Sequence, residues 1–103
     1  MRKNFRTYEL AVILYRMAGR IRLPRHLKEQ LMRAASSVAL NLAEGAGRES
    51  ALDQKRFFNI AFGSLRECQA ILDLGADTAD DARKCADSLA AHLYKLIKYC
   101  QAG

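Results

Sequence analysis

The chain has 103 residues, half of them hydrophobic, with one proline, six glycines and a formal net charge of +6. This length allows one domain that buries about two thirds of its unfolded surface and excludes two, so residues 1–103 are expected to form a single domain. Few helix breakers and abundant Leu, Ala, Arg and Lys favour an all-α fold.

Four segments carry apolar residues at helical spacing. In the first, the stripe consists of Leu10, Ile13, Leu14, Met17 and Ile21, ending near Gly19 and Arg20. Glu9 and Arg16 interrupt the apolar run around this segment, which falls far short of the roughly 20 residues of a membrane span. We therefore expect a first bundle helix and not a signal peptide.

The second segment follows Pro24, which suits the first turn of a helix, and continues until Gly45. Its stripe consists of Leu27, Leu31, Ala34, Val38 and Leu42. Ser50 with Asp53 predicts the third helix start, and that helix is expected to run to Gly75. Its stripe consists of Phe57, Ala61, Ser64, Cys68 and Leu72.

Thr78 with Asp81 predicts the start of the fourth helix. Its stripe consists of Ala82, Cys85, Leu89, Leu93, Leu96 and Cys100. Short connections make consecutive helices antiparallel, so the predicted fold is an up-down-up-down four-helix bundle.

Some apolar positions lie off these stripes and indicate contacts between subunits. They are Phe58 and Phe62 on the third helix and Ala90, Tyr94 and Ile97 on the fourth. Gly63 lies mid-helix, where glycine costs about 1 kcal/mol against alanine. Close approach of another backbone is the expected reason for it.

A polar stripe runs along the second helix, with Ser37, Asn41, Glu44 and Arg48 at i, i+4, i+7 and i+11. We interpret it as an interhelical hydrogen-bond network that fixes packing. Arg48 and the neighbouring polar groups are expected to stabilise the Glu44 carboxylate at the negative end of the helix. Ser64 and Glu67 on the third helix are assigned to the same network. If Glu44 is partly buried and paired, replacing it with alanine should cost about 1–3 kcal/mol.

Positive charge is concentrated in residues 1–33, which hold nine basic and two acidic residues. Such clustering is typical of a phosphate-binding surface, although a solvated, solubilising face explains the composition equally well. The candidate nucleic-acid-binding residues are Arg2, Lys3, Arg6, Arg16, Arg20, Arg22, Arg25 and Lys28.

Catalytic and metal-binding patterns are weak in this sequence. The three cysteines are widely spaced, and neither His26 nor His92 has a ligand partner at metal-site spacing, so we expect reduced thiols, a cytoplasmic protein and no metal or cofactor. The segment Gly45-Ala46-Gly47 lacks the remainder of a phosphate loop. We expect a protein that is not an enzyme.

Three blocks in the middle of the chain resemble a known bacterial family. They are Arg33-Ala34-Ala35-Ser36-Ser37-Val38, Asn41-Leu42-Ala43-Glu44-Gly45 with Gly47-Arg48, and Phe57-Phe58-Asn59-Ile60-Ala61-Phe62-Gly63-Ser64-Leu65-Arg66-Glu67. They are similar to the signature of the four-helix-bundle proteins encoded in intervening sequences of 23S ribosomal RNA genes, a family that includes the accessory variability protein of diversity-generating retroelements. The resemblance implies a ring of five bundles around a central channel.

Two functions therefore remain open. The first is a basic homo-oligomer that binds RNA or DNA through phosphate contacts without strong sequence specificity. The second is a protein-interaction scaffold or accessory subunit of a nucleic-acid enzyme such as a reverse transcriptase, which the retroelement branch of the family implies. Neither function involves a membrane.

Overall fold

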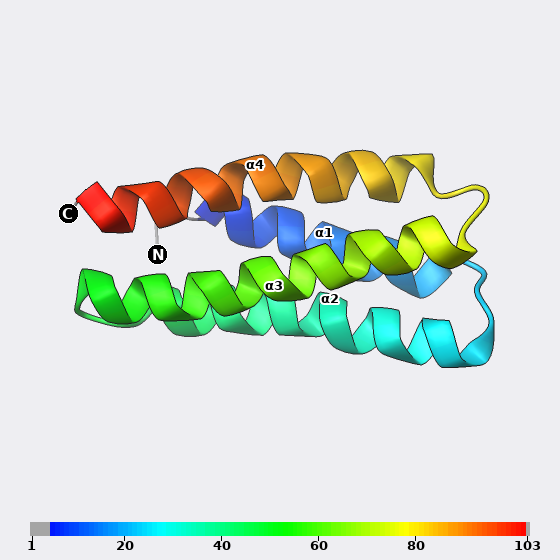
Figure 1. The fold of residues 1–103 in the computed structure, drawn as a ribbon, viewed down its shortest axis with the longest axis horizontal. Coiled ribbons are helices and arrows are strands. Elements are labelled where there is room, and N and C mark those ends of the chain that lie inside the picture. The colour runs from blue at the N-terminus through cyan, green and yellow to red at the C-terminus, as the bar shows by residue number, and fades with distance from the viewer. Residues whose placement is uncertain (1–4, 103) are drawn as a thin grey trace.

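The computed structural model describes residues 5–102, and these form an antiparallel four-helix bundle (Figure 1). The helices are α1 (Phe5–Arg20), α2 (Arg25–Ala46), α3 (Ala51–Gly75) and α4 (Asp80–Ala102). No strand occurs in this described part of the chain. The predicted all-α, up-down-up-down architecture is confirmed.

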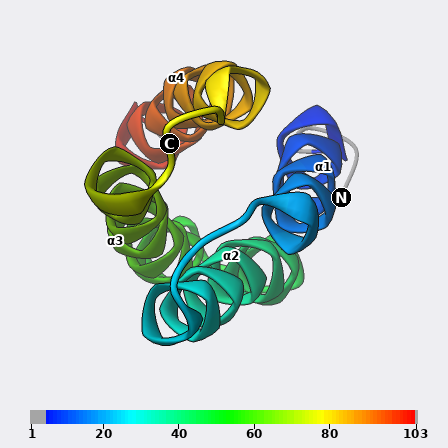
Figure 2. The ribbon, with the colours of Figure 1, turned by 90° about the vertical axis from the view of Figure 1, so that its right-hand side faces the viewer.

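The helices lie at the corners of a rod of about 41 × 21 × 18 Å. Each packs against its neighbours in chain order, and α4 returns to α1 to close the bundle (Figure 2). The α1–α2 and α3–α4 connections lie together at one end of the rod, and the α2–α3 connection lies at the other (Figure 1). None of the helices, over the described residues, is long and apolar enough to cross a membrane.

The ends of α3 match the prediction, and three other helix ends differ by one or two residues. At the start of α3 the Ser50 hydroxyl accepts a hydrogen bond from the backbone N–H of Asp53 at 3.1 Å. Pro24 precedes α2 with an extended backbone (φ −52°, ψ 146°), so its predicted place in the first turn is wrong. Helix α2 runs on to Ala46, past Gly45, and α4 begins at Asp80, so that Ala79 and not Thr78 precedes it.

The core confirms most of the predicted stripes and corrects two positions on them. Ile13 is exposed, and Phe57 is only half-buried. Phe58, expected on a spare face, is 2% exposed and is among the largest fully buried side chains. Helix α3 packs against both α2 and α4, so its buried face is wider than the single stripe used for the prediction.

Packing leaves no room for a Cβ at Gly45, crowds one at Gly75 and leaves open space at Gly63. A Cβ at Gly45 would lie 2.7 Å from the Phe58 ring, and one at Gly75 would lie 2.8 Å from the side chains of Leu23 and Leu27. A Cβ at Gly63 would have no heavy atom within 4 Å. The predicted close approach at Gly63 is therefore wrong within this chain, because that position faces open space.

These glycines give a matched pair of substitutions. Gly45→Ala should lower the free energy of unfolding by about 1–3 kcal/mol, because the buried Phe58 ring has no room to move away from a new methyl group. Gly63→Ala should raise it by about 0.5–1 kcal/mol, because alanine is the better helix former and meets no neighbour. Urea unfolding followed by circular dichroism would compare the two; equal effects of the same sign would contradict the packing at Gly45.

Candidate nucleic-acid interface

Three arginines of the predicted patch lie at the corner where α1 ends. Arg16 and Arg20 lie one turn apart on α1, and Arg22 follows in the connection to α2. All three side chains are exposed, and none forms an ion pair with any of residues 5–102. Their full charge is therefore available to a ligand.

The other predicted basic residues have roles within the fold. Arg25 Nε donates to the Glu29 carboxylate at 3.1 Å. Lys28 Nζ donates to the carbonyls of Gly19 at 2.9 Å and Ile21 at 2.5 Å, where its charge balances the negative end of α1. These contacts leave Arg25 and Lys28 with less charge to offer than the corner arginines.

The remaining members of the predicted patch are not at this corner. Arg6 lies ten residues before Arg16, about 15 Å along the helix axis, and is 3.9 Å from the Glu9 carboxylate. Arg2 and Lys3 lie outside the described residues. Arg33, which the sequence analysis left out of the patch, is exposed on α2 and has no ion pair within the described chain. Because Arg33 lies opposite the apolar stripe of the second segment, its exposure could have been predicted from the sequence.

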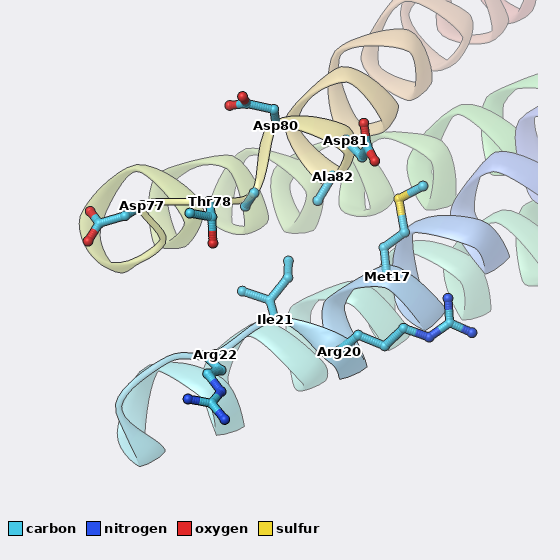
Figure 3. A pocket seen from close by; sticks show the side chains of 10 residues that line it. Met17, Arg20, Ile21, Arg22, Asp77, Thr78, Asp80, Asp81 and Ala82 are labelled. Atoms are coloured by element: carbon cyan, nitrogen blue, oxygen red, sulfur yellow. The ribbon is translucent and has the colours of Figure 1, made fainter.

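A cleft of about 700 Å³ separates the end of α1 from the start of α4 (Figure 3). Arg20 and Arg22 lie on its α1 side. The other side carries carboxylates and Thr78, and four apolar residues also line the cleft. The carboxylates are Asp77, Asp80 and Asp81, and the apolar residues are Met17, Ile21, Ala79 and Ala82.

The charges on the two sides of this cleft do not pair with each other. Asp80 lies 3.6 Å from Arg83 of its own helix, and no ion pair of the described residues joins Arg20 or Arg22 to an aspartate. The sequence did not predict the acidic side, because residues about 60 positions apart face each other only in the folded bundle. The positive corner is therefore bordered by negative charge towards α4.

The polar stripe of α2 divides into two separate groups. In the first, the Ser37 and Ser64 hydroxyls are hydrogen-bonded at 2.8 Å, linking α2 to α3. Asn41 Nδ2 donates to the Ser37 carbonyl at 2.9 Å and to its hydroxyl at 3.1 Å. Glu67 is exposed and has no side-chain hydrogen bond or ion pair within residues 5–102, so the structure does not bring it into this group.

The second group closes the turn between α2 and α3. Arg48 lies 2.6 Å from the Glu44 carboxylate and 3.7 Å from that of Asp53. Asp53 also binds Arg56 at 3.2 Å, and both guanidinium groups stack on the Phe57 ring with their carbon 4.7 and 4.5 Å from its centroid. The predicted pairing of Glu44 with Arg48 is therefore present, and the Glu44 side chain is 53% exposed.

The two groups should differ in their effect on stability. Ser37→Ala should lower the free energy of unfolding by about 0.5–1.5 kcal/mol, because it leaves the half-buried Ser64 and Asn41 groups without a partner. Glu44→Ala should cost less than about 1 kcal/mol, because exposed ion pairs are weak. Ser36→Ala is the control, since the Ser36 hydroxyl bonds only the Arg33 carbonyl of its own helix. Chemical unfolding would test this order, and a larger loss for Glu44→Ala than for Ser37→Ala would contradict it.

The thiols and histidines show no arrangement for metal binding or nucleophilic chemistry. Cys68, Cys85 and Cys100 are free and buried, and desolvation by burial raises the pKa of Cys68 to about 12. Burial also raises the pKa values of Cys85 and Cys100. Among the described residues, no three His, Cys, Asp or Glu side chains are grouped to hold a metal ion.

Comparison with known proteins identifies one family. The family described as 23S rRNA-intervening sequence protein matches residues 6–102, which is nearly the whole chain. No curated protein matches this chain.

Proposed function

This chain belongs to the 23S rRNA-intervening sequence protein family, and we propose that it is a non-enzymatic nucleic-acid-binding protein. It would hold RNA or DNA through phosphate contacts, without strong sequence specificity. The single observation that supports this proposal is the corner of Arg16, Arg20 and Arg22, three exposed guanidinium groups that no carboxylate of the described chain neutralises. Guanidinium groups bind phosphate oxygens in a bidentate manner and remain charged at all physiological pH values.

The proposed binding mode is electrostatic, because the corner has no aromatic platform for stacked bases. Tyr15 is exposed and Tyr8 is half-buried, and a sequence-tolerant single-strand site uses successive aromatic faces. Phosphate contacts carry no sequence information by themselves. The acidic side of the cleft would repel a phosphate backbone, so the bound strand is expected on the α1–α2 side of the corner.

Single neutralising substitutions would test this assignment. Arg20→Gln should weaken binding of a duplex DNA oligonucleotide and lower the slope of log affinity against log salt by about 0.9, the value for one lost phosphate contact. Arg25→Gln should change the slope less, because Arg25 is already paired with Glu29. Fluorescence anisotropy across a salt series measures both values.

Reversal of Arg16, Arg20 and Arg22 to glutamate should abolish binding and leave the helical circular dichroism spectrum unchanged, because all three side chains are exposed. Wild-type protein that fails to bind DNA or RNA at low salt would overturn the proposal. The accessory role beside a nucleic-acid enzyme, such as a reverse transcriptase, would then take its place.

We also propose that the protein acts as a homo-oligomer, with five copies as the family resemblance implies. Large apolar side chains remain exposed on the bundle, including Leu40 on α2, Ile60 on α3 and Tyr94 on α4. Repetition of the arginine corner around an oligomer would combine weak phosphate contacts into higher affinity.

Light scattering on purified protein should therefore give about five times the chain mass of 11.5 kDa at micromolar concentration. The apolar side chains that remain exposed on the bundle would be covered by neighbouring copies. A mass of one chain across this range would contradict the proposed oligomer. Phosphate binding by a single bundle would still be tested separately by the salt titration.

A further inference from the structure

Another pocket lies between the start of α1 and the second half of α4, where the two helices run side by side (Figure 1). Its volume is about 420 Å³, within the range of about 300–1,000 Å³ that small-molecule sites occupy. The residues that line it are Thr7 of α1 and His92, Lys95, Leu96 and Tyr99 of α4. Thr7 precedes Arg20 by thirteen residues, about 20 Å along the helix axis, so this pocket is separate from the arginine corner.

Thr7 supplies a buried polar group to the pocket. It is 3% exposed and continues the buried stripe of Leu10, Ala11 and Leu14, where an apolar side chain would pack as well. Its hydroxyl has no hydrogen-bond partner among residues 5–102. A buried hydroxyl without a partner destabilises a fold, so a hydroxyl of this kind on a pocket lining indicates that a ligand atom completes its hydrogen bonding.

The charge around the pocket is positive. Lys95 is exposed, and its ammonium group has no hydrogen bond or ion pair among the described residues. None of the lining residues is acidic, and residues 88–102 contain no Asp or Glu. On α1, Glu9 lies two residues beyond Thr7 and is 3.9 Å from Arg6. Free donors in positive surroundings favour a ligand with anionic oxygens.

The histidine of the lining favours one class of anion. His92 Nδ1 donates to the Ser88 carbonyl at 2.8 Å, because a carbonyl oxygen only accepts. Nε2 of the neutral ring is therefore an acceptor, and in the protonated ring it is a donor. A phosphate monoester fits both forms, because its second pKa of about 6 lets it offer either a P–OH group or a second anionic oxygen. A carboxylate or a backbone phosphodiester has no such proton to share.

The rest of the lining suits an apolar or aromatic group attached to the phosphate. Leu96 is half-buried, and the Tyr99 ring is 53% exposed. A partly exposed aromatic ring beside an aliphatic side chain offers a face against which a flat group such as a nucleobase packs.

We propose that this pocket binds a phosphate monoester carried by an aromatic or apolar group, such as a nucleoside 5′-monophosphate. Thr7 Oγ1 and Lys95 Nζ donate to the phosphate oxygens, and His92 Nε2 shares the remaining proton. Leu96 and Tyr99 contact the attached group. The same chemistry occurs in a free mononucleotide and at the 5′ end of a nucleic-acid strand. The site does not depend on the proposed binding at the arginine corner.

Calorimetric titration of the full chain with adenosine 5′-monophosphate would test the site, with adenosine as the ligand that lacks the phosphate. Lys95→Gln should weaken binding of the monophosphate about tenfold, the effect of losing one charge-assisted hydrogen bond. Lys98→Gln is the matched control, because it removes the same charge from the same helix. Lys98 does not line the pocket and lies 5.4 Å from the centroid of the Tyr94 ring, so its loss should change the affinity less than about twofold.

Thr7→Val separates ligand binding from folding. It should weaken binding of the monophosphate about three- to tenfold, because one donor is lost. The melting temperature should stay equal or rise, because the hydroxyl has no partner within the described fold. Wild-type affinity in this variant, or a lower melting temperature, would contradict the assigned role of Thr7.

A short DNA oligonucleotide with a 5′-phosphate, compared with the same strand ending in a 5′-hydroxyl, distinguishes the two sources of the ligand. Tighter binding of the phosphorylated strand that is lost in Lys95→Gln assigns the site to strand ends. Equal binding of the two strands, together with binding of the mononucleotide, assigns it to free monoesters.

No binding of adenosine 5′-monophosphate at millimolar concentration, equal binding of adenosine, or equal losses from Lys95→Gln and Lys98→Gln would overturn the proposal. Arg20→Gln should leave binding of the mononucleotide unchanged, because Arg20 does not line this pocket. Failure at this site is therefore distinguishable from failure of the arginine corner, which the salt titration measures.

Discussion

The close packing of α2 against α3 is the constraint on which the rest of the bundle depends. Gly45 admits the Phe58 ring at one end of this helix pair, and Gly75 admits the side chains of Leu23 and Leu27 at the other. The Ser37–Ser64 hydrogen bond lies between these points and joins the helices midway. Because a packed interior has little free space, the two glycine contacts and the serine pair together define one register.

Basic side chains then stabilise the helix ends that this packing creates. Lys28 donates to carbonyls at the end of α1, and Arg83 donates to those of Leu72 and Ala76 at the end of α3. Arg48 binds Glu44 at the end of α2. Carbonyl groups in the last turn of a helix have no intrahelical donor. Cations placed there stabilise the helix end, and less of their charge remains for binding a ligand. Arg20 also lies in the last turn of α1, but like Arg16 and Arg22 it forms no ion pair within the described residues.

Amphipathic spacing predicted the four helices, their antiparallel order and most of the core. A period near 3.6 residues places apolar side chains on one face of a helix, regardless of which helix packs against that face. It misplaced Phe58 and Ile13, because which residues at the edge of a stripe become buried depends on where the two neighbouring helices pack. The prediction that another backbone approaches Gly63 was also wrong. A glycine within a helix does not by itself indicate which segment, if any, packs against it.

Some features of the candidate site could likewise be predicted from the sequence, and others could not. The sequence by itself determined that this chain forms four amphipathic helices and carries its positive charge in the first third, since both follow from residue type and local spacing. Only the tertiary structure decided that Lys28 caps a helix, that Glu44 is exposed, and that aspartates of the α3–α4 connection border Arg20 across an apolar cleft. Coulomb interactions and burial depend on distances between segments far apart in the chain, and those distances exist only once the bundle has packed.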